Sequence, residues 1–203
     1  ATNYIVYLST NGYGFGNPIE VGPRLTHTVT GLMAGVDYYF RVSAANGGGE
    51  SMPSEVVGCR PRGDTNECRV LIVNGNERFD RTTNPRQNTG RQSYAPPSGS
   101  GSIERVWPRR VNSFDYVVQH GKAISAAGFA FDSCSRQAVL SQYVRLPNYD
   151  LVIWASGQSQ TNIFNPTEQV LLSTFLTNGG SLFLSGSKIA YALDRSSGPS
   201  ASD

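Results

Sequence analysis

The chain has 203 residues, of which 38% are hydrophobic and 10% aromatic, so it can bury ordinary protein cores and is not disordered. Its 17 basic and 15 acidic residues leave a net charge of +2, and the basic residues are scattered rather than gathered into a stripe with stacking aromatics. This distribution gives no support to nucleic-acid binding, and no apolar run approaches the ~18 to 20 residues that a membrane helix needs.

Side chains of alternating polarity indicate β-structure in the first 60 residues. Turn signals such as Asn11-Gly12 separate the runs. Tyr38 opens a late strand just after Gly35, and from that position its hydroxyl can reach backbone upstream and fix a corner. The predicted strands are residues 4–8, 26–30 and 38–45, with a last edge strand after Glu55.

Residues 3 to about 60 resemble the later part of a fibronectin type III domain. The resemblance rests on the corner from Leu32 to Tyr38, followed by Asn46, Gly49 and Pro53-Ser54. The two strands that precede the Tyr4 strand in that family are absent here. We therefore expect an incomplete sandwich whose inner face is either exposed or covered by another segment, and the resemblance implies a spacer or a binding platform.

From Arg69 onward the pattern changes to short apolar runs with amphipathic helices between them, which is typical of strands buried on both faces of a parallel sheet. A long polar segment, residues 74–102, reads as a loop. Strands that alternate with helices over short links imply right-handed crossovers, so this part predicts a doubly wound α/β fold. The predicted strands are residues 69–73, 129–131, 151–155 and 181–184.

Three helices are predicted in this second part. The first follows an Asn112-Ser113-Phe114-Asp115 cap, carries Phe114, Val117, Val118, Gly121 and Ile124 on one face, and ends at Gly128. The second is short and covers residues 135–142. The third has Asn165 as its cap, Pro166 at its first position and Glu168 to complete the cap, and it ends at Gly179-Gly180.

Residues 68–203 resemble the flavodoxin-like, glutamine-amidotransferase-like domain found beside fibronectin type III repeats in large secreted bacterial proteins labelled xanthan lyases or N-acetylmuramoyl-L-alanine amidases. The division of the chain is therefore residues 1–60, a linker at 61–67, and residues 68–203. The resemblance implies a secreted or cell-surface bacterial protein, and we expect the domain to continue beyond residue 203. The matching residues are 70–75 with Phe79-Asp80-Arg81, 112–115, 149–154 and 179–194.

Ligands of open α/β sheets bind beyond the carboxyl ends of the strands. The residues predicted to bind a ligand there are Asn74, Asp80, Gly157, Gln158 and Ser185. The expected partner is a polysaccharide or peptidoglycan, or neighbouring domains of the same chain.

An enzyme of this kind would place its nucleophile on the sharp turn after a buried strand. The turn after Leu184 offers Ser187, and His120 and Asp132 complete the candidate catalytic set. The hydrolase pattern G-x-S-x-G is not met, because Ser185 and Ile189 occupy the glycine positions. Structural alternatives are a hydrogen-bonded His120 beside the apolar helix face and an Asp132 that caps the following helix.

Cys59 and Cys68 flank the predicted linker and could form a disulfide, with three free thiols as the alternative. Three Cys and two His at unrelated spacings do not make a zinc site, and no cofactor is expected.

Three functions remain open at this point. The first is a non-catalytic module associated with glycan or cell wall in a secreted multidomain bacterial protein. The second is a hydrolase or lyase acting on polysaccharide or peptidoglycan, and the third is a structural surface protein. Whether the chain is an enzyme is left open.

Overall fold

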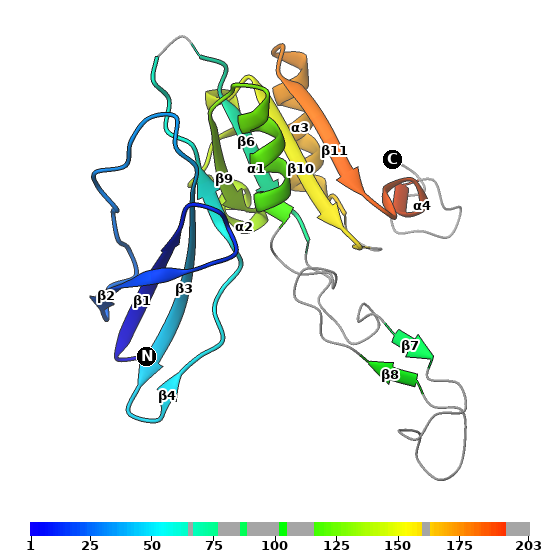
Figure 1. The fold of residues 1–203 in the computed structure, drawn as a ribbon. Helices are drawn as coiled ribbons and strands as arrows, with labels where there is room; N and C mark the ends of the chain where they lie inside the picture. Colours follow the sequence, from blue (N-terminus) through cyan, green and yellow to red (C-terminus); the bar gives the residue numbers. More distant parts are fainter. Residues whose placement is uncertain (65–66, 77–85, 89–101, 105–115, 160–162, 194–203) are drawn as a thin grey trace.

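The computed structural model describes residues 1–64, 67–76, 86–88, 102–104, 116–159 and 163–193. An antiparallel sheet near the N-terminus lies beside a parallel sheet with helices (Figure 1). No helix in the described part is long and apolar enough to span a bilayer.

The first module is an antiparallel sheet in the order β2-β1-β3-β4, with β5 paired to β3. At its centre Val6 lies opposite Val42. The backbone N–H of Met33 donates to the Tyr38 hydroxyl at 3.0 Å, which confirms the predicted tyrosine corner. The strands are β1 (Asn3–Ser9), β2 (Gly16–Gly22), β3 (Tyr38–Asn46), β4 (Gly49–Glu50) and β5 (Val57–Cys59).

The strand predicted at residues 26–30 is wrong, and β2 takes its place beside β1. A strand needs a neighbour for its backbone groups, and none lies beside residues 26–30 in the described structure. β2 tolerates Pro18 because it is an edge strand, where a missing N–H costs no ladder hydrogen bond.

One face of this sheet is open, as expected for a sandwich that lacks two strands. A hollow of about 600 Å³ lies over it, and we call this the apolar hollow. Val42, at its centre, is 36% exposed. The apolar lining comes chiefly from Tyr4, Val6, Val21, Phe40, Val42 and Val57.

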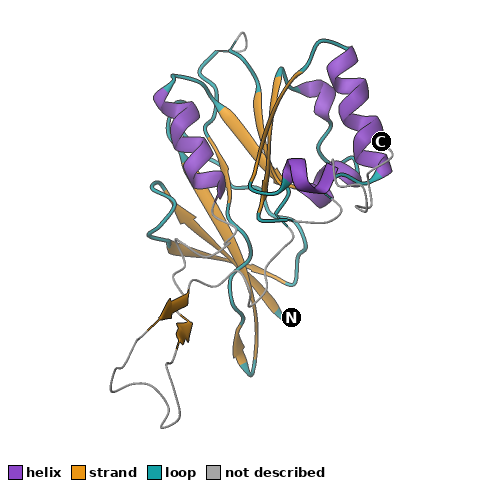
Figure 2. Cartoon of the chain, turned by 90° about the vertical axis from the view of Figure 1, so that its right-hand side faces the viewer, coloured by secondary structure: helices purple, strands orange, loops and turns teal. Residues whose placement is uncertain are grey.

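The second module is a parallel sheet in the order β11-β10-β6-β9, with helices on both faces (Figure 2). This confirms the α/β class and the doubly wound arrangement. The strands are β6 (Val70–Asn74), β9 (Phe131–Ser135), β10 (Leu151–Gly157) and β11 (Ser181–Gly186). The helices are α1 (Tyr116–Ala126), α2 (Arg136–Leu140), η2 (Leu146–Asn148), α3 (Pro166–Thr177) and α4 (Ile189–Leu193).

Helix α1 covers one face of the parallel sheet, while α2 and α3 cover the other. Four of the five residues predicted on the apolar face of α1 are buried, namely Val117, Val118, Gly121 and Ile124, and Phe114 lies outside the described residues. The capping box of Asn165 and Glu168 at α3 is present as predicted.

Two local predictions need correction. The predicted loop at residues 74–102 contains β7 (Arg86–Asn88), which pairs antiparallel with β8 (Ser102–Glu104). The strand predicted at 129–131 begins at Phe131 instead, so Asp132 lies inside β9 and the cap of α2 is Ser135. The cause is that Phe131, not Phe129, pairs with Val70 at the start of the sheet.

The two modules share a core, because the closed face of the antiparallel sheet packs on the α1 side of the parallel sheet. Tyr39 is fully buried there, in one cluster with Val117, Val118 and Phe131. Arg60 and Phe131 exchange backbone hydrogen bonds of 2.8 and 3.3 Å, so the chain after β5 pairs with the start of β9. The modules are therefore joined by packing and pairing as well as by the polypeptide.

Candidate functional site

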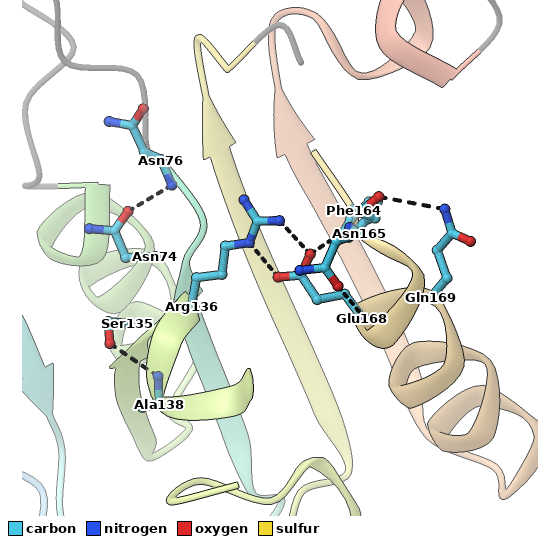
Figure 3. Close-up of polar contacts among 9 residues, drawn as sticks. All are labelled: Asn74, Asn76, Ser135, Arg136, Ala138, Phe164, Asn165, Glu168 and Gln169. Carbon is cyan, nitrogen blue, oxygen red and sulfur yellow. Dashed lines mark hydrogen bonds and ion pairs between the residues drawn. The ribbon is translucent and has the colours of Figure 1, made fainter. Parts of the chain in front are cut away.

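Because the strands of the second module are parallel, their carboxyl ends meet along one border of the sheet. We call this the carboxyl border; it comprises the ends of the four strands at Asn74, Ser135, Gly157 and Gly186. Figure 3 shows part of it, with the residues of β6, α2 and α3 that gather there. The sequence places the expected ligand site at this border.

The side chain of Asn74 is hydrogen-bonded to other residues of the chain. It is 4% exposed, and its side-chain amide donates to Glu55 Oε2 at 2.6 Å, while its Oδ1 accepts from the backbone N–H of Asn76 at 3.2 Å. Burial raises the pKa of the Glu55 carboxyl, and the hydrogen bond from Asn74 opposes this shift. Asn74 therefore fastens the first module to the end of β6 in this structure.

The ends of β10 and β11 are tied to each other. The backbone N–H and the hydroxyl of Ser187 both donate to the carbonyl of Gly157, at 2.9 and 3.4 Å. Gly157 has a φ of +54°, a left-handed conformation that favours glycine. Gln158 and Ser185 are half-buried beside this turn, and Asp80 lies outside the described residues.

Two buried polar groups at this border were not predicted. Within the described structure, Ser156 Oγ and Trp154 Nε1 have no hydrogen-bond partner. A Cβ placed on Gly75 would come within 2.3 Å of Trp154 Nε1, so the indole lies directly against that glycine. The sequence signal is the Trp154-Ala155-Ser156 run at the end of a buried strand, because alternate residues of a strand face the same side.

The three candidate catalytic residues are not brought together. Asp132 is in register with Leu71, Val152 and then Leu182 across the sheet, so it lies near the amino-terminal end. Ser187 follows Leu182 by five residues and lies three strands away from β9. At ~3.3 Å per residue along a strand and ~4.8 Å between strands, the two are separated by roughly 20 Å.

His120 lies on α1 beside its buried residues, and the hydrogen bond of the structural alternative is not found among the described residues. It is half-buried on α1, and its ring meets Phe183 edge-on with centroids 6.4 Å apart. Burial lowers the pKa of the His120 imidazole, which keeps it neutral near pH 7. Its described neighbour is an aromatic ring rather than a nucleophile.

The most buried charges among the described residues of the second module form an ion pair that was also not predicted. Arg136, the first residue of α2, binds both carboxylate oxygens of Glu168 through Nε and Nη2 (Figure 3). The Glu168 side chain is fully buried and that of Arg136 is 7% exposed. Glu168 was recognised from the sequence as a capping residue, but its partner lies in another helix and left no local signal.

The cysteine thiols are free, so the proposed disulfide between Cys59 and Cys68 is not formed. Cys59 is held in β5 opposite Tyr38, whereas Cys68 precedes Arg69, whose backbone N–H binds Asp150 in the second module. Burial raises the pKa of Cys59 to about 11 and that of Cys134 to about 12, so neither thiol is an activated nucleophile at neutral pH. The described residues hold no cluster of three or more His, Cys, Asp or Glu suited to a metal.

A further hollow lies at the opposite, amino-terminal end of the parallel sheet. It has a volume of about 300 Å³ and contains Asp132 in its wall. Tyr149 donates its hydroxyl to Asp132 Oδ2 at 3.2 Å. Asp132 therefore belongs to a polar hollow that is separate from the carboxyl border.

Comparison with known proteins bears on the first module. Residues 1–60 match the fibronectin type III domain family. This match confirms the first of the two resemblances. The tyrosine corner and the antiparallel sheet agree with it. No solved structure matches the chain.

The chain also resembles one longer curated protein. It is 26% identical over 196 residues to a Kelch domain-containing protein of Saccharolobus solfataricus. The similarity covers 86% of this chain and therefore extends over much of both modules, but it spans only 27% of the length of that protein.

Proposed function

We propose that this chain is a non-catalytic binding module of a secreted or cell-surface multidomain protein, with polysaccharide or peptidoglycan as its partner. The observation that carries this proposal is the separation of Ser187 from Asp132 across the parallel sheet. Acid-base catalysis requires hydrogen-bond reach, directly or through one water, and these residues lie far beyond it.

The interaction role is supported by the family and the protein that the chain resembles. The fibronectin type III match and the similarity to part of a Kelch domain-containing protein both favour an interaction module over an enzyme domain. The shared core around Tyr39 holds the two modules in a fixed relation, which suits a platform that presents a surface to a partner.

The glycan partner is supported by the resemblance of the second module to domains of secreted bacterial proteins that act on polysaccharide or peptidoglycan. Proteins that hold extended glycans without cleaving them need polar surface more than activated groups. Two alternatives remain: the partner is a neighbouring domain of the same chain, or the chain is an enzyme that acts on the same polymers. The following experiment distinguishes both from glycan binding.

The test incubates the purified chain with insoluble peptidoglycan and with a panel of immobilised polysaccharides, and measures both retained protein and released product. We expect retention on at least one polymer, without new reducing ends, unsaturated sugars or free amino groups. The Ser187→Ala and His120→Ala variants should be retained equally. Product release that either variant abolishes, or lack of retention on every polymer, would overturn the proposal.

A further inference from the structure

The polar hollow at the amino-terminal end of the parallel sheet lies at the junction of the two modules, and we call it the junction cleft. Its volume of about 300 Å³ is at the lower end of the range typical of small-molecule sites, which often form at domain interfaces. Its polar side chains come from four separate segments of the chain. They are Arg60, Arg62, Arg69, Asp132, Asn148 and Tyr149.

The walls of the junction cleft are fixed by backbone pairing. Arg60 is bonded to Phe131 through both its N–H and its carbonyl, and the backbone N–H of Arg69 binds the Asp150 carboxylate at 2.8 Å. The Asp150 backbone N–H in turn donates to the Arg69 carbonyl at 2.9 Å. A ligand would therefore meet a preformed surface, which lowers the entropic cost of binding.

Three guanidinium groups line the cleft, and two of them are paired with carboxylates. Arg60 is paired with Asp37 at 3.1 Å through one nitrogen, and Arg69 is paired with Asp150 at 3.3 Å. Each guanidinium has five N–H donors, so both retain donors for a further acceptor. Arg62 is exposed, and no hydrogen bond or ion pair engages it within the described part of the chain.

The positive charge of Arg62 acts on Asp150, which follows the lining residue Tyr149 in the sequence. Hydrogen bonds from Arg69 hold the pKa of the Asp150 carboxyl below its usual range, and the charge of Arg62 adds to this effect. An arginine in this position favours a carboxylate, because the planar guanidinium can bind both carboxylate oxygens. The Asp132 carboxylate can accept hydrogen bonds from hydroxyl groups, and the Asn148 amide can both accept and donate them.

We propose that the junction cleft binds a carboxylate-bearing sugar, namely one uronic acid unit of an acidic polysaccharide. The carboxylate lies on the Arg62 guanidinium, and ring hydroxyls donate to Asp132 and contact Asn148. The proposal deepens the proposed function and rests on it for the choice of a sugar over other carboxylates. It explains why this cleft combines cations with a carboxylate, since the ligand has both a negative charge and hydroxyl donors.

The experiment titrates the ¹⁵N-labelled chain with sodium glucuronate and follows the backbone amide resonances, with glucose and sodium chloride titrations at matched ionic strength. We expect saturable shifts at Arg62, Asp132 and Tyr149 with glucuronate only. Arg62→Gln should weaken binding by about tenfold, the effect of one charge-assisted contact. The matched control is Arg24→Gln, which removes the same charge from an exposed arginine beside the apolar hollow and should change nothing.

Three results would overturn the inference: no saturable shift at the cleft, an equal response to glucose, or equal losses in the two arginine variants. Tighter binding of glycine than of glucuronate would also overturn it, by assigning the cleft to an amino acid or peptide terminus. Retention of the chain on neutral polymers, unaffected by Arg62→Gln, would leave the proposed function standing while this inference fails. Glucuronate binding without retention on any polymer would support the cleft as a site for this sugar acid, while the proposed function would fail.

Discussion

Arg136 and Glu168 face each other in the interior of the second module, at the starts of α2 and α3. Glu168 gains from its place in the first turn of α3, where it also accepts the backbone N–H of Asn165 at 2.8 Å. Arg136 has no such support from its own helix, since a cation at a helix N-terminus is disfavoured. Glu168 therefore supplies a buried counter-charge to the arginine.

Replacing Glu168 by Leu should lower the free energy of unfolding by about 3–5 kcal/mol, because it removes the carboxylate that pairs with the buried Arg136 charge. Urea denaturation followed by circular dichroism measures the loss. The matched control is the double variant Arg136→Met/Glu168→Leu, which removes both charges and should recover most of the stability. Equal losses in the single and double variants would show that the loss does not come from the buried charge of Arg136.

Cys134 predicts a pH dependence of stability at the residue scale. Its thiol is 6% exposed, and burial, with a smaller contribution from Glu55, raises its pKa to about 12 from the usual value near 9. Between these values the unfolded chain releases the proton and the native chain keeps it. The free energy of unfolding should therefore fall as pH rises above about 9, by at most about 1.4 kcal/mol per pH unit from this thiol.

Urea denaturation at half-unit steps from pH 8 to 10.5 measures this slope. Cys134→Ala should show a shallower slope than the parent chain. The slope that remains belongs to groups such as Cys59, Tyr39 and Tyr149, whose pKa values are also raised. Parallel slopes in the two proteins would mean that the Cys134 thiol titrates normally in the folded state.

Elements with a strong local signal could be predicted from the sequence. The start of α3 is encoded by Asn165, Pro166 and Glu168, and β6 by an unbroken apolar run, and both are found where expected. Strands of the first module were harder, because pairing depends on neighbours distant in sequence. Residues 26–30 have β propensity but no partner strand, whereas β2 contains Pro18 and still pairs with β1.

The same limit applies to the candidate site. The carboxyl ends of three of the four strands were located correctly. The partners of Asn74 and Arg136, however, are Glu55 and Glu168, which no local pattern connects to them. The junction cleft was not predicted at all, because its walls come from four segments that only the tertiary fold brings together. Asp132 was placed at the wrong end of the sheet by a shift in the start of β9.

Helix α1 approaches β9 closely at Gly121, where a Cβ would lie 2.6 Å from Phe131 Cζ. Phe131 is 2% exposed, so it is enclosed by the surrounding core. Gly121→Ala should therefore destabilise the chain by about 1–2 kcal/mol, since overpacking of ~1–3 kcal/mol exceeds the gain of up to ~1 kcal/mol in helix propensity. Thermal unfolding measures the change.

Gly47→Ala is the control, because no atom lies within 4 Å of its Cβ position. It should alter stability by less than about 0.5 kcal/mol. A Gly121→Ala protein more stable than the parent would show that α1 can move away from β9 without cost.

At the scale of the whole molecule, the antiparallel sheet has two faces with different roles. One face carries Tyr39, which is fully buried against α1 and β9, and the other carries Phe40, which lines the apolar hollow. Neighbouring residues of one strand therefore belong to a shared core and to an open face. Because Tyr39 packs against the second module, the stability of each module depends on the other.

This shared core predicts that the two modules unfold in one cooperative transition. Trp154 is buried in the parallel sheet, and in a Trp107→Phe background its fluorescence reports on the second module alone. Tyr39→Ala, although located in the first module, should move the Trp154 transition to lower urea by the equivalent of about 3–5 kcal/mol, the usual cost of removing a large buried aromatic ring. Phe40→Ala, next to it on the open face, should have a clearly smaller effect because it leaves the shared core intact. A Trp154 transition that does not move in Tyr39→Ala would show that the parallel sheet folds independently of the fibronectin type III module.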